Sequence, residues 1–92
     1  MLVKLIEIQR SMRGGTASLR ELYVNPDHIV SVCDDTIANQ TLMNEVRDLG
    51  LVEGVQFSKV VIAEGNFAKT ITIVGSPPEI YKKIRKKQVL RG

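Results

Sequence analysis

The alternation of hydrophobic and polar positions predicts five β-strands in this chain. The pattern is clearest in residues 67–74, where Ile71 and Ile73 share a face opposite a row of alanine, threonine and valine side chains. Residues 57–63 are also rich in β-branched side chains, and only the short Gly-containing segment 64–66 separates the two runs. This spacing predicts a β-hairpin.

Two further strands are expected near the N-terminus, at residues 2–9 and 19–24. Both runs are rich in residues that favour β-structure. The segment between them contains Gly14 and Gly15 among small polar residues, which is typical of a long, flexible connection. We therefore expect a second hairpin with a long loop.

Residues 28–33 predict the remaining strand, which follows a turn at residues 25–27. Asparagine can bond to its own backbone in such a turn, and proline fixes φ at the next position. Strict alternation would place Ile29, Ser31 and Cys33 on one face of this strand. We expect Cys33 to be a buried thiol.

An amphipathic pattern predicts a helix over residues 40–49. Leu42, Val46 and Leu49 recur at the spacing of one helix face. Gly50 follows directly, and glycine is the residue that most readily adopts the positive φ found just after a helix C-terminus.

The second predicted helix has the strongest local signal in the chain. Ser76 can cap its N-terminus, and a proline follows where a missing N–H has no cost. Glu79 stands three residues after the cap and completes a capping box. We expect this helix to span residues 77–88 and to bury Ile80 and Ile84.

These elements predict an α+β fold in a single domain, residues 1–92. We expect an antiparallel sheet of about five strands in two layers, with one inserted helix and one C-terminal helix on the same face. The chain has 92 residues and 4% aromatic residues, so its core must be built from valine, isoleucine and leucine. A thin core of this size favours homo-oligomers.

Few groups in the sequence could support catalysis or metal binding. The chain has one histidine, His28, and one cysteine, Cys33, which fall on opposite faces of one expected strand. Asp34 and Asp35 could bind a cation, but two adjacent carboxylates favour a turn or helix entry. We therefore expect no enzyme, no metal and no cofactor. The lone cysteine and the absence of an apolar run of about 18 residues predict a cytoplasmic protein outside the membrane.

Positive charge is concentrated at the C-terminus. Residues 82–92 hold six basic residues and no acid, whereas residues 1–81 carry a formal charge of −3. Such a field attracts phosphate, and arginine pairs with phosphate in bidentate fashion. We expect Lys82, Arg85 and Lys86 to bind a phosphate-bearing ligand. The alternative is a solvated helix face whose charge complements the helix C-terminus.

A second candidate for phosphate binding is the loop at Arg13, Gly14 and Gly15. Its backbone N–H groups and guanidinium could reach a phosphate. No Gly-Lys-Ser/Thr sequence follows, so the loop is not a P-loop. The alternative is a plain flexible connection.

Two short segments of the sequence share a residue pattern with a known family. The matching positions are Val24, Asn25, Asp27, Ile29 and Val32, followed by Val74, Ser76, Glu79 and Ile80. The first segment precedes the hairpin expected at residues 57–74, and the second joins the last strand of that hairpin to the C-terminal helix. In this respect the chain resembles the very small bacterial and phage proteins that include the flagellar FlbD family. The insertion at residues 34–56 departs from that family's pattern.

In size and in sheet-plus-helix character, the chain is also similar to phage anti-defence proteins of the Thoeris sponge type. That resemblance implies an oligomer in the bacterial host cytoplasm that sequesters a cyclic or phosphate-bearing signalling nucleotide. We therefore expect a phage-encoded, non-enzymatic, homo-oligomeric binding protein for a phosphate-bearing small nucleotide.

Two other functions are compatible with the sequence. One is a regulatory module that docks its basic helix on an acidic protein partner. The other is an RNA- or single-strand-binding protein. Nucleic acid is the less favoured partner, because the two tyrosines and two phenylalanines are scattered and offer no stacking platform.

Overall fold

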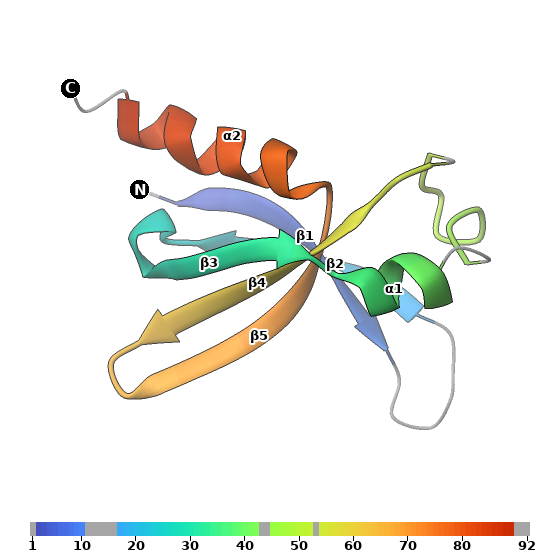
Figure 1. Cartoon of the computed structure of the whole chain (residues 1–92), viewed down its shortest axis with the longest axis horizontal. Helices are drawn as coiled ribbons and strands as arrows, with labels where there is room; N and C mark the ends of the chain where they lie inside the picture. Colours follow the sequence, from blue (N-terminus) through green and yellow to red (C-terminus); the bar gives the residue numbers. More distant parts are fainter. Residues whose placement is uncertain (1, 11–16, 43–44, 53, 90–92) are drawn as a thin grey trace.

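Five strands form one antiparallel sheet, which carries two α-helices (Figure 1). The computed structural model describes residues 2–10, 17–42, 45–52 and 54–89. The strands are β1 (Val3–Arg10), β2 (Ala17–Val24), β3 (Ile29–Asp34), β4 (Phe57–Glu64) and β5 (Phe67–Val74), and the helical elements are the 3₁₀ turn η1 (Pro26–His28), α1 (Thr36–Thr41) and α2 (Pro77–Val89). The predicted α+β fold with about five strands, one inserted helix and one C-terminal helix is confirmed.

The sheet consists of two hairpins and one added edge strand. Its strand order is β2-β1-β5-β4-β3. β1 pairs with β2, and β4 pairs with β5, over all eight residues of each strand. In the described residues, β1 and β5 pair at just two positions, Glu7↔Ile73 and Ile8↔Thr72. The hairpins therefore diverge on either side of this short ladder, and their ribbons cross in Figure 1.

The two helices pack against opposite faces of the sheet. Side chains alternate along β1, so Leu5 points to one face and Ile8 to the other. Leu5 packs in one core cluster with Ile80 of α2, whereas Ile8 packs in a second cluster with Leu42 at the end of α1. The expectation that both helices cover the same face is therefore wrong. Apolar spacing identifies the buried side of a helix, but it does not say which face of the sheet that side meets.

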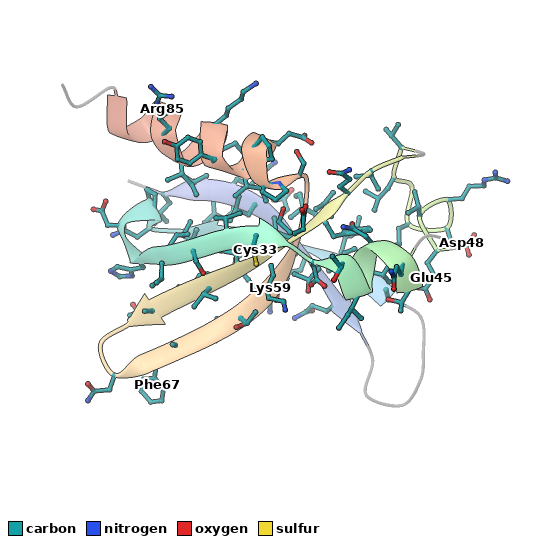
Figure 2. The ribbon with its side chains drawn as sticks, viewed as in Figure 1. Cys33, Glu45, Asp48, Lys59, Phe67 and Arg85 are labelled. Atoms are coloured by element: carbon teal, nitrogen blue, oxygen red, sulfur yellow. The ribbon has the colours of Figure 1, made fainter. Side chains whose placement is uncertain are left out.

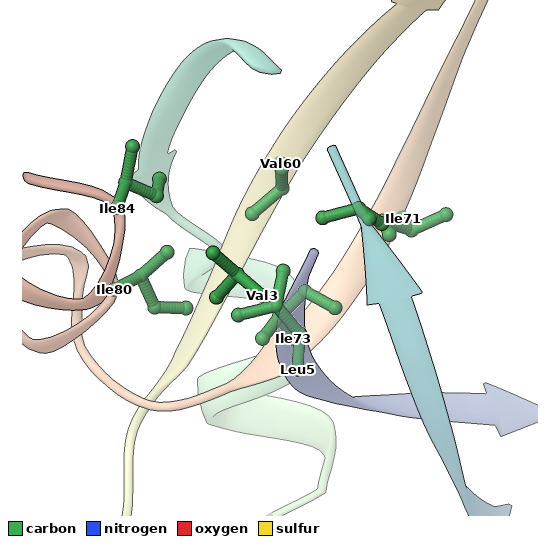
Figure 3. Close-up of a cluster of buried hydrophobic side chains, with 8 residues drawn as sticks. Val3, Leu5, Val60, Ile71, Ile73, Ile80 and Ile84 are labelled. Carbon is green, nitrogen blue, oxygen red and sulfur yellow. The ribbon is translucent and has the colours of Figure 1, made fainter. Parts of the chain in front are cut away.

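The face covered by α2, here called the α2 face, carries a core of aliphatic side chains (Figure 3). Its buried members are Val3, Leu5, Val24, Val60, Ile71, Ile73, Ile80 and Ile84. On this face the prediction of a core built from valine, isoleucine and leucine is confirmed. The opposite face, here called the α1 face, carries a second buried cluster of Ile8, Ala17, Ala38, Leu42, Val46 and Phe57. On the α1 face the prediction is wrong in part, because Phe57 and two alanines are buried there.

Helix α2 begins at the residue that the sequence predicted, and its capping box is formed. The Ser76 hydroxyl donates to Glu79 Oε1 at 2.9 Å, and the backbone N–H of Ser76 donates to the same atom at 3.2 Å. The backbone N–H of Glu79 donates in return to Ser76 Oγ at 3.4 Å. Ile80 and Ile84 are buried against the sheet, as predicted.

The junction between β5 and α2 is fixed by one backbone and one side-chain hydrogen bond to residues 56 and 58, at the start of β4. Gly75 donates its N–H to the carbonyl of Gln56 at 2.8 Å, and its carbonyl accepts from the buried hydroxyl of Ser58 at 2.7 Å. Gly75 has a φ of +128°, a conformation that side-chain-bearing residues rarely adopt. The direction in which α2 leaves the sheet therefore depends on this glycine.

The inserted helix lies earlier in the chain than the amphipathic pattern indicated. Residues 36–41 form α1, whereas residues 45–50 form turns, so the predicted helix over 40–49 is wrong. The reason lies in Asp35, whose carboxylate accepts from the backbone N–H of Ala38 and caps α1 at residue 36. The interpretation as a helix entry is confirmed for Asp35, whereas Asp34 is the last residue of β3. Gly50 has the positive φ expected of it, 75°.

A β-bulge interrupts the alternation of β3. The register with β4 shifts between Ile29 and Ser31, so Ile29 and Val32 both pack against the core of the α2 face. The predicted strict alternation is therefore wrong, and so is the prediction of a buried thiol, because Cys33 is exposed. The turn before β3 is confirmed, since Asn25 Oδ1 accepts from the backbone N–H of Asp27 at 3.0 Å.

Candidate functional site

Exposed cationic side chains lie along α2. Lys82, Lys83 and Arg85 are exposed, while the two isoleucines of the helix are buried against the sheet. Arg85 points away from the sheet in Figure 2. Lys82 and Arg85 are three residues apart, so they lie within one turn of each other on the helix surface. Lys86 belongs to α2, but its side chain is outside the described part of the structure.

The single acidic residue of α2, Glu79, is committed to the helix start. Its carboxylate accepts two hydrogen bonds from Ser76. The side-chain and backbone hydrogen bonds from Ser76 lower the pKa of Glu79 below its ordinary value of 4.5, and the nearby charges of Lys83 and Lys82 lower it further. Within the described residues, no carboxylate forms a salt bridge with Lys82, Lys83 or Arg85. These cations are therefore available to an anion from solution.

The second predicted phosphate site cannot be placed in the fold. Arg13, Gly14 and Gly15 lie outside the described residues. The structure therefore brings together two of the six predicted binding residues, Lys82 and Arg85, as neighbouring exposed side chains.

A pocket that the sequence did not predict lies between α1 and the sheet. It has a volume of about 260 Å³. Its lining residues are Ile8, Asp35, Ile37, Ala38, Thr41, Leu42 and Thr72. The lining comes from β1, β5 and the α1 segment, which lie far apart in the sequence. In the sequence, the adjacent carboxylates at residues 34 and 35 were the one feature that pointed to this pocket. They did not indicate that its walls are apolar.

Of the described residues that line this pocket, Asp35 is the one with a charged side chain. Asp35 is only 7% exposed. Its Oδ1 accepts from the backbone N–H of Ala38 at 3.0 Å, and its Oδ2 accepts from the hydroxyl of Thr72 at 2.8 Å. Among the side chains that the structure describes, no basic group forms a salt bridge with this carboxylate. Lys59 is the cross-strand partner of Thr72 and is exposed on the same face.

In the described part of the chain, the side chains that could support metal or nucleophilic chemistry are not gathered into one site. Among the described residues, no group of three His, Cys, Asp or Glu side chains could hold a metal ion. His28 lies at the end of η1, with its Nδ1 3.9 Å from Glu64 Oε1. Across the described residues, no helix has the length and apolar character needed to span a membrane.

Comparisons with known proteins identified no relative of this chain. The chain matches no family model, no curated protein and no solved structure.

Proposed function

We propose that this chain is a non-enzymatic binding protein whose helix α2 binds a small phosphate-bearing ligand, such as a nucleotide. The observation that carries the proposal is the set of three exposed cations, Lys82, Lys83 and Arg85, on a helix whose one acid is bonded to its own N-cap. Lysine and arginine side chains that face solvent attract phosphate over several ångströms.

The charge distribution favours a small ligand over a long nucleic acid. Net positive charge is confined to residues 82–92, because the basic residues among residues 1–81 are outnumbered by acidic ones and that segment carries a formal charge of −3. A long phosphate backbone would extend from α2 over this acidic surface and be repelled by it. A mononucleotide or cyclic dinucleotide would remain within the field of the helix.

Self-association in a bacterial cytoplasm and a phage origin belong to the same proposal. Several large apolar side chains face solvent, among them Phe67 at 82% exposure and Val52 at 79%. Contact with a second copy of the chain would bury such side chains. Mass measurement in solution tests the proposed self-association. A strictly monomeric mass at micromolar concentration would contradict it.

Calorimetric titration with a panel of cyclic and linear nucleotides at low salt tests the binding function. We expect saturable, exothermic binding of at least one phosphate-bearing ligand, and we expect added salt to weaken that binding. The matching nucleosides, which lack phosphate, serve as controls and should not bind. The proposal fails if no nucleotide binds at high micromolar concentration, or if nucleosides bind as well as nucleotides.

A further inference from the structure

We propose that the pocket between α1 and the sheet is a second binding site, which takes a small organic cation with an apolar body and a protonated amine. This site is separate from the cations of α2, because α2 packs on the other face of the sheet. The inference does not depend on the proposed function of α2.

The walls of the pocket select for an apolar body. Ile8, Ala38 and Leu42 are buried and form its apolar lining, and Ile37 adds an exposed apolar side chain at 67% exposure. A volume of about 260 Å³ lies below the usual range of sites for drug-sized ligands. We therefore expect a small occupant, of the size of a single ring or a short branched chain.

The carboxylate of Asp35 selects for a positive charge. A carboxylate offers about four acceptor positions, and the described side chains and backbone fill two of them, with Ala38 N–H and the Thr72 hydroxyl. Both donors are neutral, so they orient the carboxylate without cancelling its charge. A buried charge is costly without a partner of opposite sign, and an ammonium group in the pocket would supply that partner.

The charge of Lys59 provides a test that distinguishes a binding role of Asp35 from a purely structural one. It stands opposite Thr72 on β4 and is exposed on the face that carries the pocket (Figure 2). Its ammonium group repels a bound cation through long-range Coulomb forces. Removing this charge should therefore strengthen the binding of an amine, whereas it should not affect a neutral molecule of the same shape.

The test is an NMR titration of the whole chain with cyclohexylamine, with cyclohexanol as the neutral analogue. The methyl signals of Ile8, Ile37 and Leu42 report occupancy. We expect saturable shifts with the amine and binding at least about tenfold weaker with the alcohol. Asp35→Asn should weaken amine binding by about the same factor, because asparagine still caps a helix but carries no charge. Lys59→Gln should strengthen amine binding and leave alcohol binding unchanged.

Matched variants separate this site from the rest of the molecule. Asp48→Asn removes an exposed carboxylate and should leave amine binding unchanged. Lys82→Gln should also have no effect, so failure here is distinguishable from failure of the α2 proposal. The inference is overturned if the amine gives no saturable shift at millimolar concentration. It is also overturned if a folded Asp35→Asn variant binds the amine as tightly as the original chain.

Discussion

Thr72 of β5 donates its hydroxyl hydrogen to the carboxylate of Asp35 at 2.8 Å, and this bond joins the sheet to the first turn of α1. The second carboxylate oxygen accepts from the backbone of Ala38. One buried side chain therefore both caps the helix and fixes its position on the α1 face. Asp35, Ala38 and Thr72 all line the pocket beside α1.

Replacing Asp35 with alanine should destabilise the fold by about 1–2 kcal/mol, because the helix loses its cap and the Thr72 hydroxyl loses its acceptor. Urea unfolding measures this free energy. Asp35→Asn is the control, since asparagine caps a helix as well as aspartate does. We expect it to lower the free energy of unfolding by only a few tenths of the loss caused by alanine. Equal losses in the two variants would show that capping is not the role of this side chain.

The ion pair between Glu7 and Arg20 should contribute more stability than other pairs on the same hairpin. Glu7 is 7% exposed, and its Oε1 accepts from both Nε and Nη2 of Arg20, its cross-strand partner. Arg20→Ala leaves the buried carboxylate without these donors, and we expect a loss of about 1–3 kcal/mol in urea unfolding.

Lys4→Ala provides the matched control for this pair. Lys4 and Glu21 are joined at 3.7 Å on the same two strands, but both side chains are more than half exposed. Exposed pairs contribute about 0.2–1 kcal/mol at most. If the two substitutions cost the same, burial does not determine the strength of the Glu7–Arg20 pair.

Local signals in the sequence were sufficient for the two hairpins and for α2. The capping box at Ser76 and Glu79 forms from residues three apart, so no knowledge of the fold was needed to predict it. The same is true of the hairpin whose strands are joined across Gly65, which has a φ of 60°. Such features depend on neighbours in the chain, and the sequence displays those neighbours directly.

The position of α1 and the pocket could not be predicted, because both depend on contacts between distant residues. Asp35 and Thr72 are 37 residues apart. Asn39 is held in the same way, since its Oδ1 accepts from the backbone N–H of Phe57 at 2.7 Å. These tertiary bonds outweighed the apolar spacing of residues 42–49, which favoured a later helix.

The stability contributed by Glu79 should depend on pH. Its folded-state pKa lies below the ordinary value of 4.5, first because of the hydrogen bonds from Ser76. The unfolded chain therefore binds its proton more readily than the folded chain, and acid favours unfolding. The stabilisation is present above pH 4.5 and is lost as the pH falls through the folded-state pKa.

The comparison of the original chain with Glu79→Gln isolates this effect, because glutamine can also take part in a capping box but does not titrate. We expect the original chain to be the more stable of the two at pH 7. The difference in unfolding free energy should shrink steadily below pH 4.5. A difference that stays constant down to strongly acidic pH would contradict this assignment.

The cations of α2 are the basis of the proposed binding function, and a pair of matched double variants tests them. Lys82→Gln with Arg85→Gln removes two charges from α2. Arg47→Gln with Lys69→Gln removes one lysine and one arginine, both exposed, from elsewhere on the surface. The two variants therefore have the same net charge and differ in where the charge is lost.

The most direct measurement is the dissociation constant of each variant for the tightest-binding nucleotide of the panel, determined at one fixed low salt concentration. We predict that the α2 variant binds at least about tenfold more weakly than the original chain, because charge-assisted contacts to phosphate are lost. The Arg47/Lys69 variant should stay within about twofold, since its changes act only through screened long-range charge. Equal weakening in both variants would contradict the account, because it would show that net charge alone, and not the surface of α2, governs binding.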